Sequence, residues 1–491
     1  MSAGNLRVVL AADQELGAGN VLLRLAEHGA DMDMPRVTFD TEVDAIAAWT
    51  PLSLRTLTER VAARAEWFAR HGIGRRDPVA VYVTSSADLF LNFFALTWLG
   101  AIPALMNGGM PIEIAAEYIR RLRGVGVIID ADHAEMASRD LGAPILGDAA
   151  ETGTGDPSGA PAHFRHHPSD PVAITHSSGT TRMPAAIVHS HHGLFAAVRA
   201  VRLTEPRQHG PVREMSAFPQ AHTAGVIIMN EALCNGYELL CLSAQGGAFG
   251  SSGEIILDAI ERWRPTAVYG FAVTWAELAR YDLTKRDVSS VRFWSNSGDC
   301  AHEAHIRRLI AVGSHHAYKD GAVVSLPGSR FNDTLGSTEM GYGGNDSVNT
   351  FRTRLNGYYL TGDLMYRDEE GYFYHVDRAS DALDLGDGKW LYTALSEERI
   401  LRHCPDVRDC TLLAVRGNDG RLTVDALLAL TEDAAPDRNR EAEVRAALGD
   451  VAVELLLRVV AVPESEMVLG PTGKVRKFLM RQRLLASTSA S

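Results

Sequence analysis

The hydrophobic positions along the chain follow two alternating spacings. Residues 53–73 repeat apolar side chains at steps of three and four, which is typical of a helix with one buried face, and the apolar run at 77–83 predicts a buried strand. Helical and strand-like spacing then recur through 87–130, 195–203, 229–242, 253–270 and 304–312. Because this alternation is typical of parallel strands joined by crossover helices, we predict an α/β fold.

The pattern changes near residue 380, where 395–415 and 421–430 predict a small unit of one helix and strands. We therefore expect a large N-terminal domain of layered sheets and helices at 1–379 and a small C-terminal α+β domain at 380–491. The segment 147–170 is rich in Gly, Pro and Asp and predicts a surface linker.

Composition and charge narrow the class of protein. Residues 89–106 are the most apolar stretch, but Asn92 and Pro103 interrupt it, so a buried helix and strand are favoured over a membrane span. The chain has 48 basic and 61 acidic residues and no long basic run, which argues against nucleic acid or an anionic membrane as a partner. Five cysteines without a CxxC pair, and an N-terminus unlike a signal peptide, predict a cytoplasmic protein with reduced thiols.

The stretch ITHSSGTTRMPAAIVHSH at 174–191 has the character of a phosphate-binding loop. A strand-like run leads into small and hydroxyl-bearing residues, whose backbone N–H groups and hydroxyls could surround phosphate oxygens. These residues are Ser177, Ser178, Gly179, Thr180 and Thr181. The loop has no lysine and lacks a GK[ST] ending, which argues against a conventional P-loop NTPase.

Three later stretches complete a pattern. NDTLGSTEMG contains Thr338 and Glu339, LTGDLMYRDEEGYFYHVDR places Asp363 in a tight turn and Arg378 after a hairpin-like run, and GPTGKVRK places Lys474 in a glycine turn. Each stretch alone has an ordinary reading, as a helix cap, a turn hydroxyl or a solvated lysine. In this order and spacing they closely resemble the adenylate-forming superfamily over essentially the whole chain, and acyl-CoA synthetases most of all.

The resemblance implies ATP-dependent activation of a carboxylic acid to an acyl-AMP, release of pyrophosphate, and transfer of the acyl group to coenzyme A. In such phosphoryl chemistry, positioning and charge neutralisation carry most of the catalysis. By similarity the loop would hold the β- and γ-phosphates, Thr338 the α-phosphate, and Glu339 the Mg²⁺ ion. Lys474 would stabilise transition-state charge, while Asp363 and Arg378 would bind the ribose. The remaining nucleotide-site residues implied by the resemblance are Ser297, Gly298, Asp299, Leu335 and Gly336.

The segment FPQAHTAG resembles the family's acyl-pocket segment and contains His222 and Gly225; Gly336 is expected beside it. His222 could line the pocket, orient the carboxylate, or belong to the core. Amino-acid-activating relatives carry an aspartate in this segment, and its absence here argues against an amino acid. The apolar segments 225–229, 246–252 and 269–275 would line a pocket with few charges, which favours a hydrophobic or aromatic carboxylic acid.

Departures from the family pattern weaken some expectations. Arg182 stands where the family has glycine, and we hypothesise that it replaces part of the missing lysine charge; the alternative is a solvated loop arginine. Leu335 stands where an aromatic residue usually stacks on adenine. By similarity the C-terminal domain is mobile about a hinge, which we expect at Ser380, where the family has Asp or Lys. The segment 385–393, expected to enter the thiol tunnel, matches the family pattern less well than the other motifs.

Two alternatives therefore stay open: an adenylation enzyme that loads the pantetheine of a carrier protein, and a non-catalytic nucleotide-binding relative. The histidine groups do not indicate a metal site, because no cysteine or carboxylate lies at matching spacing. They are His163, His166 and His167, and His189, His191 and His192.

Overall fold

The structure is a computed structural model that describes most of the chain. It leaves out residues 1–2, 178–182, 205–211, 244–245, 248–249, 299–300, 335, 338–340, 343–353, 356–357, 360–362, 371–372, 380, 417–420, 432–433, 435–438, 464–465, 469–474, 476, 478, 481 and 484–491.

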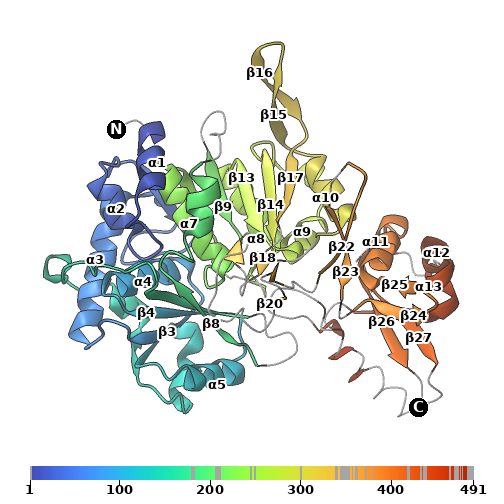
Figure 1. Ribbon diagram of the computed structural model, residues 1–491, viewed down its shortest axis with the longest axis horizontal. Helices are drawn as coiled ribbons and strands as arrows, with labels where there is room; N and C mark the ends of the chain where they lie inside the picture. Colours follow the sequence, from blue (N-terminus) through green and yellow to red (C-terminus); the bar gives the residue numbers. More distant parts are fainter. Residues whose placement is uncertain are drawn as a thin grey trace.

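Two mainly parallel sheets form the body of the molecule (Figure 1). In the first, all neighbouring strands are parallel except the last pair. Its order is β6 (Ile145–Asp148), β5 (Gly126–Ile129), β3 (Pro78–Val83), β4 (Ile102–Asn107), β7 (Pro171–His176) and β8 (Ala186–Ser190).

The second sheet is parallel except for the pairing of its last two strands. Its order is β17 (Arg330–Thr334), β14 (Phe293–Ser297), β13 (Ala267–Gly270), β9 (Arg213–Ser216), β10 (Glu238–Cys241), β1 (Pro35–Phe39) and β2 (Leu52–Ser53). The predicted α/β class and its parallel strands are confirmed.

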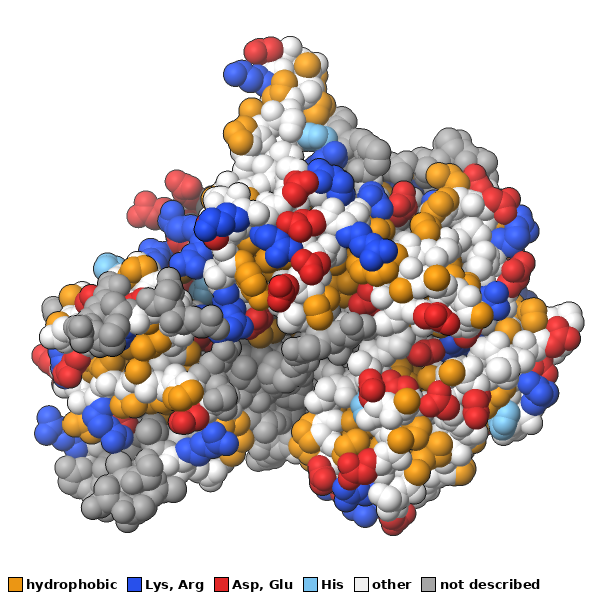
Figure 2. All heavy atoms as spheres, turned by 180° about the vertical axis from the view of Figure 1, so that it is seen from behind, with side chains coloured by type: hydrophobic (Ala, Val, Ile, Leu, Met, Phe, Trp, Pro, Cys, Tyr) orange, Lys and Arg blue, Asp and Glu red, His pale blue; other side chains and the backbone are white. Residues whose placement is uncertain are grey.

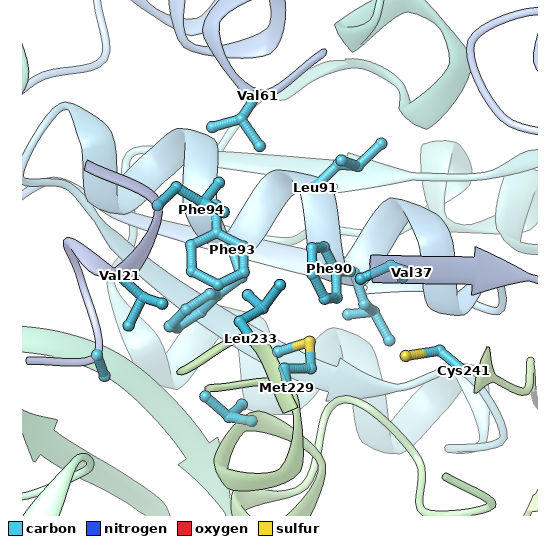
Figure 3. Close-up of a cluster of buried hydrophobic side chains, with 14 of the residues drawn as sticks. Val21, Val37, Val61, Phe90, Leu91, Phe93, Phe94, Met229, Leu233 and Cys241 are labelled. Atoms are coloured by element: carbon cyan, nitrogen blue, oxygen red, sulfur yellow. The ribbon is translucent and has the colours of Figure 1, made fainter. Parts of the chain in front are cut away.

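Helices pack on these sheets and supply most of the core. Figure 3 shows side chains converging from α3 (Leu54–Arg70), α4 (Ser86–Trp98), α7 (Thr223–Asn235) and strand β1. Ser53 and Ser85 cap α3 and α4, since each side chain accepts a backbone N–H from the first turn. The other helices of the body are α1 (Ala3–Ala12), α2 (Val21–Glu27), α5 (Ile112–Leu122), α6 (Ala149–Thr152), α8 (Gly253–Trp263), α9 (Ala272–Leu278) and α10 (Glu303–Ile310).

The apolar stretch 89–106 is divided between α4 and β4, and nearly all of it is buried, as predicted. Among the described helices none combines the length and apolar character that crossing a bilayer requires. The cysteines within the described residues, Cys234, Cys241, Cys404 and Cys410, are buried thiols that form no disulfide.

The predicted surface linker is packed more closely than expected. His166 is buried and its Nε2 lies 2.9 Å from the carbonyl oxygen of Thr97 at the end of α4. Phe164 lies so close to Gly100 that a Cβ there would stand 2.6 Å from the ring, and the positive φ of 72° at Gly100 also favours glycine. The segment crosses the surface, but apolar and histidine side chains attach it to α4.

The C-terminal part has its own apolar cluster around β26 (Val407–Arg416), β27 (Leu422–Leu430) and β28 (Leu456–Val462). The helices α11 (Thr393–His403), α12 (Arg440–Ala447) and α13 (Asp450–Leu455) contribute to this cluster. Two hairpins precede it, β22 (Asp363–Arg367) with β23 (Phe373–Arg378) and β24 (Leu383–Gly386) with β25 (Lys389–Leu391). These elements agree with the small α+β unit predicted from 395–430.

A hairpin that was not predicted, β15 (Ser314–Lys319) with β16 (Ala322–Pro327), projects from the body (Figure 1). Three short ladders complete the described strands: β11 (Gly246–Gly247) with β12 (Gly250–Ser251), β18 (Gly336–Ser337) with β19 (Gly341–Tyr342), and β20 (Arg354–Leu355) with β21 (Tyr358–Tyr359). On the face seen in Figure 2, the basic and acidic side chains of described residues are interspersed.

Candidate active site

The predicted phosphate-binding loop joins two antiparallel neighbours, β7 and β8. Its base is closed by Ser177, which donates its backbone N–H to the carbonyl of Ala185 (3.0 Å) and accepts the N–H of Ala185 on Oγ (3.0 Å). The other loop residues of the prediction, Ser178, Gly179, Thr180, Thr181 and Arg182, lie outside the described residues. The structure thus assigns Ser177 a role in closing the loop, which the sequence did not indicate.

Three histidines lie around the base of this loop and the start of α7. His176 donates Nδ1–H to the carbonyl of Ser177 (3.0 Å), and its Nε2 accepts the N–H of Asn107 (3.2 Å). One donated and one accepted bond define a neutral ring with its proton on Nδ1. His189 Nε2 lies 2.8 Å from Thr175 Oγ1, and His222 caps α7 by accepting the N–H of Ala224 on Nδ1 (3.1 Å).

Burial keeps all three rings uncharged near neutral pH. It lowers the pKa of His222 to about 3, with His176 and His189 adding to the effect, and lowers the pKa of His189 to about 4. Burial also lowers the pKa of His176. Removing a cation from water is unfavourable, so these side chains can form hydrogen bonds without carrying charge.

His222 stands beside two phenylalanines. Its ring meets Phe271 edge-on at 4.8 Å, and Phe271 lies 4.7 Å from Phe218. Together the three rings form an aromatic wall, in which Phe218 and His222 belong to the segment predicted to bind the acyl group and Phe271 lies beside it. Gly225 has a packing role: a Cβ there would stand 2.8 Å from both the Cα of Gln220 and the carbonyl oxygen of Pro219.

Three predicted stretches meet at one edge of the seven-stranded sheet. The acyl-pocket segment follows β9, Ser297 ends the parallel strand β14 and Gly298 follows it, and Gly336 follows β17. Ser297 pairs in register with Thr334, whose Oγ1 donates to the carbonyl of Asn296 (2.6 Å). The carboxyl ends of parallel strands are where open α/β sheets bind ligands. Asp299, Leu335, Thr338 and Glu339 belong to the same stretches but lie outside the described residues.

Asp363 and Arg378 are cross-strand partners in the hairpin β22–β23. Arg378 Nε lies 3.0 Å from Asp363 Oδ1, and His375 Nε2 lies 3.6 Å from the same oxygen. The prediction that both residues belong to one site is consistent with this pairing. The prediction of a tight turn at Asp363 is wrong, because Asp363 is the first residue of a strand.

The sequence did not reveal the role of the neighbouring Asp377. Its carboxylate is buried and accepts the backbone N–H groups of Thr393 and Ala394 at the start of α11. A carboxylate at a helix N-terminus satisfies backbone donors that would otherwise lack partners. The only sequence signal was the position of Asp377 beside Arg378.

The C-terminal lysine segment is described in part. Lys474 and the expected hinge Ser380 lie outside the described residues. Lys477 is described, and its Nζ lies 2.8 Å from Thr393 Oγ1 and 2.9 Å from Glu397 Oε1. The segment 385–393, expected as a loop, contains the end of β24, the turn at Asp387 and Gly388 with φ of 51° and 74°, and strand β25.

The two histidine groups of the sequence come together in space. His166 and His191 stack at 4.7 Å, and His191 Nδ1 accepts the N–H of Gly19 (3.2 Å). Within the described part of the chain, no group of three or more His, Cys, Asp or Glu residues is arranged to hold a metal ion.

Comparison with known proteins agrees with this arrangement. A family model described as AMP-binding enzyme matches residues 32–324. A relative from Streptomyces named 3-aminoavenalumate diazotase is 36% identical over 98% of each chain, and an anthranilate–CoA ligase from Pseudomonas aeruginosa is 24% identical over 73% of this chain and 77% of its own. The crystal structure of an anthranilate CoA ligase in complex with anthranoyl-AMP has the same fold, with a TM-score of 0.78 at 16% identity, covering 99% of this chain and 100% of that chain.

The family model alone spans more than half of the chain, and the Streptomyces relative spans nearly all of it. The chain therefore belongs to the AMP-binding enzyme family, within the adenylate-forming superfamily, and is similar to acyl-CoA synthetases.

Proposed function

We propose that this protein activates an oxyanion with ATP, forming its adenylate and releasing pyrophosphate, and that the activated group then passes to a nucleophile. The observation that best supports this is the convergence of the segments after β9, β14 and β17 at one sheet edge. That edge would hold the acceptor group, the adenine and the α-phosphate close together.

We assign ribose binding and neutralisation of the phosphate charges to residues at the two ends of the nucleotide. Asp363, oriented by Arg378, accepts the ribose hydroxyls. The backbone N–H groups of residues 178–182 would bind the departing pyrophosphate, and Arg182 would add positive charge. Glu339 would hold Mg²⁺, which would supply further charge to the phosphates, and Lys474 would stabilise the oxygens that become negative during the transfer. If Arg182→Ala left the KM for ATP and the adenylation rate unchanged, Arg182 would be a solvated residue.

The second substrate is proposed to be aromatic. The rings of Phe218, Phe271 and His222 form an apolar wall, and burial keeps His222 neutral. Such a wall suits an uncharged aromatic ring and offers no carboxylate to an amino acid's ammonium group.

The reaction we favour is diazotisation of an aromatic amine, because the relative at 36% identity carries the name 3-aminoavenalumate diazotase. Nitrite resembles a carboxylate in being a poor electrophile. An oxygen of nitrite would attack the α-phosphorus, pyrophosphate would leave, and a mixed anhydride O=N–O–AMP would form.

The amine nitrogen would then attack the nitrosyl nitrogen and lose one of its two protons to water, and AMP would leave with one nitrite oxygen. The N-nitrosamine loses its N–H proton and gains one on oxygen, giving a diazohydroxide. That species takes up a further proton and loses the other nitrite oxygen as water, leaving the diazonium ion.

The second candidate is an aromatic acyl-CoA synthetase, in which a carboxylate takes the place of nitrite and coenzyme A takes the acyl group. The anthranilate–CoA ligase supports it at lower identity. A carrier-protein pantetheine would be an equivalent thiol acceptor. A loop that faces the thiol was expected where the β24–β25 hairpin lies. Transfer to a thiol therefore has less support than adenylation.

One assay separates the candidates. The protein is incubated with ATP and Mg²⁺, pyrophosphate is measured, and four mixtures are compared: nitrite, nitrite with an aminocinnamic or aminobenzoic acid, the aromatic acid alone, and the aromatic acid with coenzyme A. Diazonium is detected by coupling to an aromatic amine as an azo dye. Dye that depends on ATP and nitrite supports diazotisation, whereas an acyl-CoA product supports the synthetase. Silence across a broad panel would favour a non-catalytic nucleotide-binding protein.

A further inference from the structure

A chain of polar contacts joins the ribose-binding pair to the C-terminal lysine segment. Asp377 follows Val376 on β23 and precedes Arg378, and its carboxylate accepts the Oγ1–H of Thr393 (3.1 Å) as well as backbone N–H groups of α11. Thr393 Oγ1 in turn accepts a bond from Lys477 Nζ (2.8 Å). The bond between Lys477 and Thr393 joins residues 84 positions apart in the sequence.

Lys477 is also attached to the interior of the C-terminal unit. Its Nζ lies 2.9 Å from Glu397 Oε1, and that oxygen accepts the backbone N–H of Leu412 on β26 (2.7 Å) and the hydroxyl of Thr411 (3.2 Å). Glu397 is buried, so it fixes the ammonium group against both α11 and β26.

The charge of Lys477 is stable in this position. Burial by itself lowers the pKa of Lys477, but the carboxylates of Glu397, Asp381 and Asp377 more than compensate and raise it. A buried ammonium surrounded by carboxylates and a hydroxyl is satisfied electrostatically, and its geometry is restricted.

Apolar contacts fix the same segment on the other side. Val475 packs against the cluster of Leu413, Leu427 and Met480. In the sequence Lys474 follows Gly473, directly precedes Val475, and stands three residues before Lys477. The described residues that follow Lys474 in the sequence, Val475 and Lys477, are therefore fixed by one apolar and one ionic contact.

We propose that Lys477 is a positioning residue for adenylation, which sets the place of the Lys474 segment relative to the ribose-binding pair through Thr393 and Asp377. This inference rests on the proposed role of Lys474 in adenylation. Phosphoryl chemistry is sensitive to small displacements, because a shift of about 1 Å in a catalytic group can cost about 100-fold in rate. Lys477 acts through Lys474 and is not assigned a contact with substrate.

The test uses the full-length protein and separates positioning from stability. Lys477→Met alone would leave buried carboxylates without their cation, so the main variant is Glu397→Gln/Lys477→Met, which removes both charges and keeps similar volumes. Lys477→Arg keeps the cation, and Lys474→Ala reports the function assigned to that lysine. For each variant the thermal midpoint, the kcat and KM of ATP-dependent pyrophosphate release, and the conversion of a supplied acyl or nitrosyl adenylate are measured.

We expect Glu397→Gln/Lys477→Met to fold. Its kcat for pyrophosphate release should fall at least about tenfold, while its KM for ATP changes less than about twofold. It should convert supplied adenylate at the wild-type rate. Lys477→Arg, which keeps the cation, should have a kcat between those of the double variant and the wild type. If the folded double variant keeps the wild-type kcat while Lys474→Ala is inactive, the positioning role is overturned and the proposed function stands. If Lys474→Ala itself keeps full adenylation, the role of Lys474 in the proposed function fails first.

Discussion

Arg378 and Asp363 face each other across the hairpin β22–β23, with Nε 3.0 Å from Oδ1. The Asp363 side chain is 6% exposed and that of Arg378 38% exposed, so the arginine shields and orients a carboxylate that is otherwise buried. A carboxylate held in this way keeps a fixed direction for accepting two hydroxyls, as ribose recognition requires.

Replacing Asp363 by asparagine should therefore weaken ATP binding. Loss of a charged acceptor costs about 1.5–3 kcal/mol, which corresponds to a rise in the KM for ATP of about tenfold or more. Initial rates of pyrophosphate release at varied ATP concentration measure this change. Asp320→Asn, at the exposed turn of the β15–β16 hairpin, is the matched control and should have the wild-type KM. An unchanged KM in Asp363→Asn would remove Asp363 from the nucleotide site.

His222 should make the stability of the protein depend on pH. Burial lowers its pKa to about 3 in the folded state, against about 6.5 when unfolded, so the unfolded state binds more protons between these values. Stability contributed by the neutral ring is present above about pH 6.5 and is lost as the pH falls toward 3, at up to about 1.4 kcal/mol per pH unit.

The variant His222→Asn keeps a side-chain acceptor for the α7 cap and removes the titration. Urea unfolding from pH 7 to pH 5 should show a smaller loss of unfolding free energy in His222→Asn than in the wild type. Equal losses in both proteins would mean that His222 is not buried as a neutral ring.

Gly225→Ala should destabilise the first turn of α7. The new Cβ would stand 2.8 Å from the Cα of Gln220 and from the carbonyl oxygen of Pro219, so the backbone must shift to make room for it. We expect a loss of about 1–3 kcal/mol in unfolding free energy. Gly74→Ala is the control, because its Cβ would come no closer than 4.0 Å to its nearest neighbour, Asp77. Similar stability of the two variants would contradict the close approach.

A second contact across the two parts of the chain involves Glu398 on α11. Its carboxylate accepts the backbone N–H groups of Glu303 (3.0 Å) and Ala304 (3.2 Å), which begin α10, and lies 3.0 Å from His302 Nδ1. Glu398→Ala should therefore speed amide exchange at Glu303 and Ala304 by at least about tenfold, because the first turn of α10 loses its acceptor.

The matched control for this experiment is Glu441→Ala, since Glu441 pairs with Arg445 on its own helix and is more than half exposed. Hydrogen exchange followed by mass spectrometry reports both variants. Unchanged protection of α10 in Glu398→Ala would mean that the two parts of the chain are held together by other contacts, such as Arg408 with Glu277.

The sequence predicted the elements that bury apolar faces. Helix α3, strand β3, helix α4 and strand β4 follow their periodicity closely, because local spacing determines which face is apolar. The hairpin β15–β16 was not predicted. Much of it is exposed, so its hydrophobic pattern is not determined by packing against a core.

The sequence can propose site residues where they form contiguous motifs, as at Asp363, Arg378 and His222, and their roles stay predictions. The contacts of Asp377 with Thr393 and of Thr393 with Lys477 were missed, because they join residues that only the tertiary fold brings together. The turn predicted at Asp363 was wrong because a Thr-Gly-Asp sequence resembles a turn, while cross-strand pairing with Arg378 extends the strand to Asp363.

The central claim is that an oxygen of the activated oxyanion becomes bonded to the α-phosphorus of ATP. The most direct measurement supplies ¹⁸O-labelled nitrite together with an aromatic amine, and ¹⁸O-labelled aromatic carboxylate in a parallel reaction, and determines the label in the AMP formed. The account predicts one ¹⁸O atom in AMP from the true substrate, together with pyrophosphate. Unlabelled AMP, or ADP and phosphate as the products, would contradict it.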